Sequence, residues 1–154
     1  MALKQPEIFV DGDACPVKDE ILRVAERHGL SVHLISNQWH RQANRPGVNQ
    51  VVVAEGPDVA DDWIAEHIGA GDIAVTQDIP LAARCLEKDA SALGPTGRPF
   101  TKDNIGMALA MRDLNAELRD RGEIKGYVPA FTKKSRSEFL SALESAIQKA
   151  KRRT

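Results

Sequence analysis

The chain has 154 residues, of which 42% are hydrophobic and 5% aromatic, so its core must be mainly aliphatic. No stretch approaches the roughly 18 apolar residues of a membrane span, and the first ten residues lack the pattern of a signal peptide. Two cysteines, Cys15 and Cys85, provide neither a disulfide framework nor metal-finger spacing. We therefore expect one soluble cytoplasmic domain over residues 1–154, with no membrane contact.

The net charge of −1 hides an asymmetry along the chain. Residues 1–120 carry a net charge of −7, and residues 121–154 carry one of +6. An acidic body with a basic tail suits a protein that gathers cations in one place and contacts polyanions in another. A solvated terminal helix, with lysines near its end where the dipole favours them, explains the tail equally well.

Short apolar runs alternate with amphipathic segments along the chain. Strands are predicted at residues 7–10, 31–36, 49–55 and 72–76. Helices are predicted at residues 16–29, 57–69, 79–89, 101–122 and 135–153, the first with Pro16 in its first turn and Gly29 at its end. This alternation predicts a three-layer α/β fold, in which helices cover both faces of a mainly parallel sheet.

Polar residues follow several of the predicted strands. Asp11 and Asp13 end the run "IFVDGD", Asn37 follows "SVHLIS", and Thr76 and Asp78 follow "DIAV". Ligands of such sheets bind outside the carboxyl ends of the strands. We therefore expect these side chains to meet at one edge of the sheet.

Each of these aspartates also has a structural explanation. Asp11 or Asp13 could cap the first helix, although Pro16 as first helical residue would make Cys15 the cap. Asp78 could cap the helix that begins near Pro80. A catalytic or metal-binding role is favoured for all three aspartates.

Asp61 falls on the apolar stripe of its predicted helix, with Ile64, Ala65 and Ile68. A carboxylate on this stripe costs free energy unless a metal, a catalytic neighbour or a buried hydrogen-bond partner compensates it. Asp62 lies on the polar side of the same helix, and Asp58 suits its N-cap.

The resulting set of candidate ligands contains only oxygen. The histidines at positions 28, 33, 40 and 67 have no ligand spacing, and Cys85 lies on a core face of its helix. The predicted catalytic and metal-binding residues are Asp11, Asp13, Asp61 and Asp78. Carboxylates of this kind favour Mg²⁺ or Mn²⁺, ions that activate water and neutralise charge on a phosphate.

Two further segments could contact a nucleic acid. Trp39, Arg41 and Arg45 place an aromatic ring and two guanidinium groups in one loop, which could stack a base and hold phosphates. Lys133, Lys134 and Arg136, at the start of the last predicted helix, could bind phosphates. An ordinary exposed loop and a solvated helix end have the same composition.

Several motifs resemble the YaiI/YqxD family of bacterial proteins: "DGDACPV", "NQ" at 37–38, "DVADDWI", "TQDIPLAARCLEK", "ALGPTGRPFT" and "MRDLNAELR". The family is similar to the PIN-like superfamily of metal-dependent nucleases, which have an α/β fold and an acidic cluster. The resemblance implies that Asp11 is the first-strand acid, Asp61 the helix acid and Asp78 the later strand-end acid. Asp13 belongs to the family's D-x-D-A-C-P signature. The chain departs from the family at "GYVPAF" (126–131), often Gly-Gly-Pro, and at Ser135-Arg136, often Asp-Arg.

These observations predict a Mg²⁺- or Mn²⁺-dependent nuclease, acting on RNA. One alternative is a non-catalytic module that binds RNA or protein on the same fold. Another is a phosphatase of the haloacid dehalogenase type with Asp11 as nucleophile, because "DGDAC" resembles its D-x-D motif.

Overall fold

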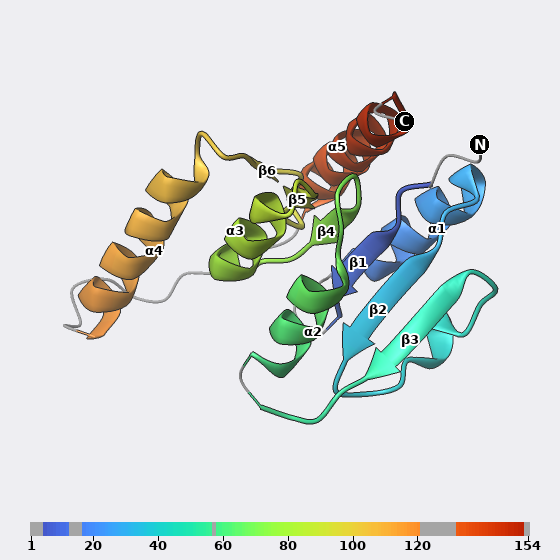
Figure 1. Cartoon of the computed structure of the whole chain (residues 1–154), viewed down its shortest axis with the longest axis horizontal. Coiled ribbons are helices and arrows are strands. Elements are labelled where there is room, and N and C mark those ends of the chain that lie inside the picture. Colours follow the sequence, from blue (N-terminus) through green and yellow to red (C-terminus); the bar gives the residue numbers. More distant parts are fainter. Residues whose placement is uncertain (1–4, 13–16, 57, 121–131, 153–154) are drawn as a thin grey trace.

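Six strands form one sheet in the order β3-β2-β1-β4-β5-β6 (Figure 1). The computed structural model describes residues 5–12, 17–56, 58–120 and 132–152. Five strands run parallel to their neighbours, and β6 pairs antiparallel with β5. The strands are β1 (Ile8–Asp11), β2 (Val32–Ser36), β3 (Val48–Val52), β4 (Ile73–Val75), β5 (Ser91–Leu93) and β6 (Pro99–Phe100).

In the part of the chain that the structure describes, five α-helices and one short 3₁₀ helix accompany the sheet. They are α1 (Lys18–His28), η1 (Arg41–Ala43), α2 (Val59–His67), α3 (Ile79–Glu87), α4 (Ile105–Asp120) and α5 (Lys133–Arg152). All five predicted helices are present. However, α1 begins two residues later than predicted, with Val17 at its N-cap, and it ends before Gly29 as predicted.

The sequence pattern did not predict β5, β6 or η1, which have only three, two and three residues. Unlike β4, which is equally short, β5 and β6 are not part of a continuous apolar run such as "DIAV", and Gly and Pro residues follow or interrupt them. The pattern also started α4 too early. The Thr101 hydroxyl accepts a hydrogen bond from the Asn104 backbone N–H at 3.1 Å, and the Asn104 side chain accepts one from the Thr101 N–H at 2.9 Å. These reciprocal bonds occupy the residues just before the helix.

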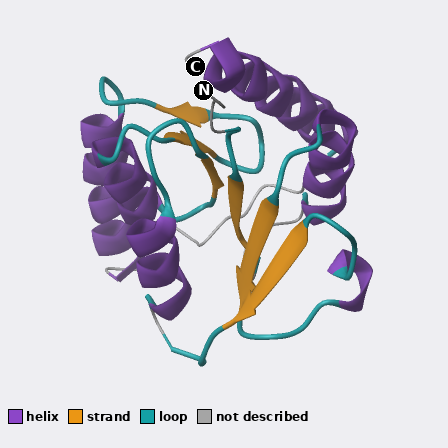
Figure 2. Cartoon of the chain, turned by 45° about the vertical axis from the view of Figure 1, so that its right-hand side comes forward, coloured by secondary structure: helices purple, strands orange, loops and turns teal. Residues whose placement is uncertain are grey.

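Helices lie on both sides of the sheet, so the predicted three-layer α/β fold is confirmed (Figure 2). Alternate residues of β1, β2 and β4 belong to the two cores on these sides. Ile8 and Val10 of β1 pack in one core with α1 and α5, including the fully buried Phe139. Phe9 points the other way, into a second core with α2, α3 and the start of α4. This period of two is the expected property of a strand that is buried on both faces.

The order in which the strands are added to the sheet reverses between β1 and β4. Moving away from this pair, the chain order runs outward to β2 and β3 on one side and to β5 and β6 on the other. The segments that follow β1 and β4 therefore go to different faces: α1 packs with the first core and α3 with the second. Such a switch point leaves a crevice at the carboxyl ends of the two strands.

Candidate active site at the switch point of the sheet

Asp11 is the last residue of β1 and is only 8% exposed. The hydroxyl of Thr76, which follows β4, donates a hydrogen bond to Asp11 Oδ2 at 3.3 Å. Gly12 follows directly, and a Cβ added there would lie 2.9 Å from Leu34 Cδ1 and 3.1 Å from the Ile35 carbonyl oxygen. Glycine therefore lets the chain leave β1 tightly against β2, and Asp11 faces the crevice beside β4.

Asp61 of α2 and Asp78 lie within hydrogen-bonding reach of each other. The pKa of Asp61 is raised from 3.8 to about 7. Burial is the largest cause, followed by the charges of Asp78 and Asp11, a hydrogen bond with the Asp78 side chain, and the charge of Asp58. Burial and these neighbours therefore disfavour the charged form of Asp61 up to about neutral pH.

Asp78 contacts Asp61 and also caps a helix, which is the structural role that the sequence offered for it. Its Oδ1 accepts a hydrogen bond from the Leu81 N–H at 2.9 Å, which makes Asp78 the N-cap of α3. Its own N–H donates to the Thr76 hydroxyl at 3.0 Å. Capping and the contact with Asp61 use one carboxyl group, so the cap holds Asp78 in position for Asp61.

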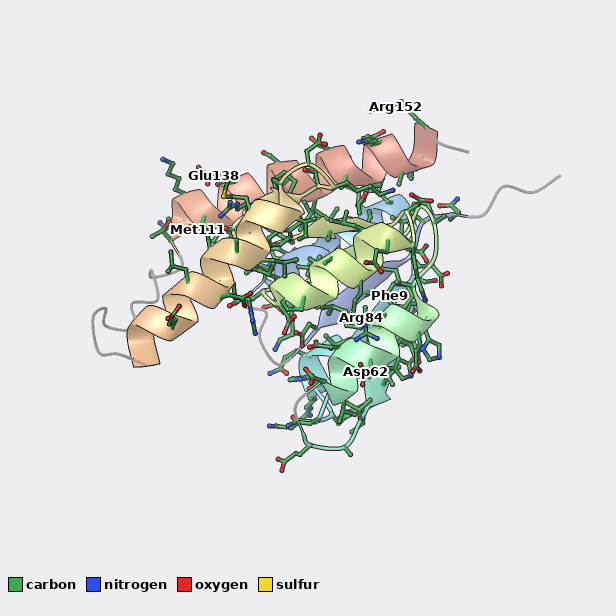
Figure 3. All side chains as sticks on the ribbon, turned by 60° about the vertical axis from the view of Figure 1, so that its left-hand side comes forward. Phe9, Asp62, Arg84, Met111, Glu138 and Arg152 are labelled. Atoms are coloured by element: carbon green, nitrogen blue, oxygen red, sulfur yellow. The ribbon has the colours of Figure 1, made fainter. Side chains whose placement is uncertain are left out.

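Two further aspartates lie near the start of α2. Asp58 occupies the N-cap position as predicted, but in the left-handed conformation (φ 69°) and without a side-chain capping bond. Asp62 is exposed, as predicted, and its Oδ1 accepts a hydrogen bond from Arg84 of α3 at 2.7 Å (Figure 3). This ion pair links the outer surfaces of α2 and α3.

The donor set contains only carboxylate and hydroxyl oxygen, which suits a hard cation such as Mg²⁺ or Mn²⁺. Across residues 5–12, 17–56, 58–120 and 132–152, no three His, Cys, Asp or Glu side chains are grouped so that they could hold a metal ion. Asp13, the remaining predicted ligand, lies outside the described residues, as do Cys15 and Pro16. Mg²⁺ needs fewer protein ligands than three, since it is often held by one or two carboxylates together with water and phosphate oxygens. The Asp61–Asp78 pair meets that requirement.

The predicted substrate residues near β2 are divided between two edges of the sheet. Asn37 follows Ser36, the last residue of β2, and the nearby Trp39 is 59% exposed. Both therefore lie at the carboxyl edge, as Asp11 does. Arg41 is the first residue of η1, after which the chain runs back to the opposite edge of the sheet. There the Arg45 carbonyl accepts a hydrogen bond from the Val48 N–H at the start of β3. Arg45 thus lies at the amino edge, away from the acids.

The predicted cations of α5 also differ from one another. Lys133 and Lys134 are exposed in its first turn. Arg136 Nε instead donates to Oε1 of Glu20 at 2.9 Å, and Glu20 is only 8% exposed. Arg136 therefore fastens α5 to α1. The departures from the family pattern at 126–131 lie outside the described residues.

Lys18 is a basic residue of this edge that the sequence pattern did not indicate. Its Nζ donates to the Gly12 carbonyl at 3.0 Å, directly after Asp11. A lysine in the first turn of a helix opposes the helix dipole. That unfavourable position is the signal by which the sequence could have revealed it.

The remaining candidates have structural contacts. His28 bonds Glu144, His33 bonds Glu7, His40 bonds Ser36, and His67 stacks on Trp63. Cys85 is fully buried, as predicted, and burial raises the pKa of its thiol to about 12. These groups are therefore held by the fold rather than presented at the acidic site.

A cavity of about 500 Å³ lies elsewhere, between the β5–β6 edge and the carboxyl-terminal half of α5. Its lining includes Ala92, Ala146 and Ala150 and none of the acids of the switch point. This hollow and the concentrated charge therefore occupy different parts of the molecule. Charge and pKa, rather than the shape of a hollow, locate the candidate active site.

The fold and this site define an α/β protein with an acidic group at the switch point of a mainly parallel sheet. Residues 9–149 match the model of the uncharacterised YaiI/YqxD family. The chain therefore belongs to the YaiI/YqxD family.

Its relatives match it over nearly their whole length. A UPF0178 protein of Parvibaculum lavamentivorans is 64% identical over 147 residues, which cover 96% of this chain and 97% of the relative. A UPF0178 protein of Rhodospirillum rubrum is 57% identical, covering 95% and 98%. One of Agrobacterium fabrum is 53% identical, covering 97% of each chain. No solved structure matches the chain. No helix within the described residues is both long and apolar enough to cross a lipid bilayer.

Proposed function

We propose that this protein is a Mg²⁺- or Mn²⁺-dependent nuclease that hydrolyses phosphodiester bonds in RNA. The observation that carries the proposal is the raised pKa of Asp61, caused by burial, by the charges of Asp78 and Asp11 and by a hydrogen bond with the Asp78 side chain, together with the hydrogen bond between Thr76 and Asp11. Like charges collected in one crevice of a stable fold are typical of a functional site. The resemblance to PIN-like nucleases supports the same reaction class.

Each residue has a distinct role in this proposal. Asp61 and Asp78, in their charged forms, would hold the cation. A divalent cation in such a site supplies activation of water and neutralisation of charge on the phosphate. Asp11, kept in orientation by the Thr76 hydroxyl, accepts a proton from the attacking water. Lys18 holds the backbone at Gly12 and thereby the position of Asp11.

The decisive experiment is an RNA cleavage assay in Mn²⁺ with the substitutions Asp11→Asn and Asp78→Asn. Asn at position 78 still caps a helix well, and Asn at position 11 can still accept the Thr76 hydrogen bond, so both variants should fold. We expect cleavage to fall by at least roughly a hundredfold, in line with the loss of a general acid–base group. Asp62→Asn, which changes a neighbouring exposed acid, is the matched control and should cleave normally.

Other outcomes would select the alternatives. Mn²⁺ binding without cleavage of any RNA or DNA would indicate a binding module that keeps the fold. Hydrolysis of small phosphomonoesters without RNA cleavage would indicate a phosphatase with Asp11 as nucleophile.

A further inference from the structure

The turn between β5 and β6 lies against the first two turns of α5. A Cβ added at Gly97 would lie 2.7 Å from the carbonyl oxygen of Glu138, and Gly97 has φ 90°. An L side chain at that position would collide with backbone and adopt a strained conformation. Glycine therefore allows the turn to rest directly on α5, with Arg98 as the next residue.

The same turn is connected to the acidic site by hydrogen bonds. The Leu93 carbonyl, which precedes the turn, accepts from the Thr76 N–H at 3.0 Å, and the Arg98 carbonyl accepts from the Gly94 N–H at 2.9 Å. The Thr76 hydroxyl donates to Asp11. Arg98 and the acids therefore belong to one edge of the sheet, although Arg98 is twenty residues beyond Asp78 in the sequence.

Exposed cations occur on both sides of this contact: Arg98 in the turn, and Lys133 and Lys134 in the first turn of α5. Arg98 and Lys133 form no ion pair with another described residue, and Lys134 lies 3.9 Å from Glu138 with its side chain 86% exposed. An ion pair this long and exposed contributes little. Arg136, by contrast, is held by Glu20. Among the described residues of the turn and of the start of α5, Arg98, Lys133 and Lys134 are thus available to a ligand.

We propose that Arg98, Lys133 and Lys134 form a phosphate-binding surface that holds an RNA backbone on the β5 side of the acidic site. This inference rests on the proposed function. A guanidinium group can bind a phosphate through two parallel hydrogen bonds, and lysines contribute point charges that displace counterions. This surface adds Arg98 to the residues predicted from sequence. It leaves out Arg136, which is paired with Glu20, and Arg45, which lies at the amino edge of the sheet.

The test is the salt dependence of binding to a fluorescent single-stranded RNA, measured by anisotropy in EDTA so that the RNA stays intact. Arg98→Ala should weaken binding and flatten the plot of log K against log salt by about 0.7 for one lost phosphate contact. Lys133→Ala with Lys134→Ala should flatten it by about 1.4, twice that amount. Arg45→Ala is the matched control and should change neither value. Arg136→Ala should lower the melting temperature and leave the slope unchanged.

Binding and cleavage together separate this inference from the proposed function. If Arg98→Ala binds RNA like the parent while Arg45→Ala binds weakly, RNA follows the opposite edge and the inference is wrong, even if the protein cleaves RNA. RNA bound through Arg98 but cut under no metal condition would contradict the nuclease and support the surface. RNA that does not bind at all would overturn the surface.

Discussion

Two carboxyl groups lie on opposite faces of the sheet, and their pKa values are shifted in opposite directions. Asp61 lies among other acids, and its pKa is raised to about 7. Glu144 of α5 lies among donors, and hydrogen bonds from His28, Gln148 and Arg27 lower its pKa to about 2. Lys151 donates to the other ring nitrogen of His28 at 3.1 Å, so the nitrogen that faces Glu144 carries the proton.

The contacts of Glu144 stabilise the fold. The surroundings of Asp61 cost stability, which the rest of the fold has to supply. Around Glu144, hydrogen-bond donors from His28, Gln148 and Arg27 favour the charged form, and the cluster joins α5 to α1. Around Asp61, burial and three neighbouring carboxylates all oppose ionisation. Proteins usually break rules of local stability at functional sites, so the switch point, rather than the α1–α5 contact, is where a ligand is expected.

The largest effect that we expect is a decrease in the free energy of unfolding as pH rises, caused by Asp61. Between pH 3.8, the ordinary pKa of the Asp61 carboxyl, and about 7, its raised value, folded Asp61 keeps a proton that the unfolded chain has released. The free energy of unfolding in EDTA should therefore decrease across this range by up to about 1.4 kcal/mol per pH unit, lessened by solvent because Asp61 is only half-buried. Urea unfolding at several pH values measures the slope. Asp61→Asn should remove it, and a slope that persists would assign the titration elsewhere.

Metal ions should act next most strongly, at the same acids. At pH 7.5, Mg²⁺ or Mn²⁺ at a hundred times its dissociation constant should raise the free energy of unfolding by about 2.7 kcal/mol. Asp61→Asn and Asp78→Asn should lose most of this response in thermal melts, whereas Glu144→Gln should keep it. Parent melting curves that are the same in EDTA, Mg²⁺ and Mn²⁺ would argue for a site without a metal.

Glu144 should show the reverse pH dependence. Its stabilising contribution is fully present above pH 4.5, the ordinary value of its pKa, and is lost as pH falls toward 2. Glu144→Gln should therefore cost about 1 kcal/mol at pH 7, a modest amount because the side chain is 34% exposed. The cost should vanish near pH 2. Glu66→Gln, at an exposed position of α2, is the control, and an equal loss there would show a general charge effect.

Substitution of Asp62 should have the smallest effect on stability, which would place Asp62 outside the acidic site. Its ion pair with Arg84 joins side chains that are 55% and 46% exposed, so Asp62→Asn should change stability by about 0.5 kcal/mol or less. The pH slope and the metal response should both survive. If either were lost, Asp62 would belong to the site beside its neighbour Asp61.

The acidic half of this contrast follows from the sequence, whereas nothing in the sequence pattern marked Glu144. The apolar run before Asp11 and the position of Asp61 on an apolar helical stripe marked both acids as costly, and the structure finds them buried and half-buried. The positions of β1, β2 and β4 followed from apolar runs of the predicted kind. These features are local, because strand and helix periodicities repeat within a few residues.

Which charges meet is a property of the folded chain. Arg98 and Arg136 look alike in the sequence, yet Arg136 is bound to Glu20 from another helix. Arg98 lies instead on the turn between two short strands that the pattern did not reveal. Arg45 follows Trp39 by only six residues, but the chain passes from one edge of the sheet to the other between them. No local pattern encodes such distances.

The order of the amino acids therefore establishes the α/β layers, the main strands and helices, and the acids that burial makes expensive, because hydrophobic periodicity and propensity act over neighbouring residues. Only the tertiary structure brings Asp61 into contact with Asp78, makes Asp78 the N-cap of α3 as well, and pairs Arg136 with Glu20. Electrostatic coupling acts through space rather than along the chain. It depends on the crossovers that bring α2, β1 and β4 to one crevice.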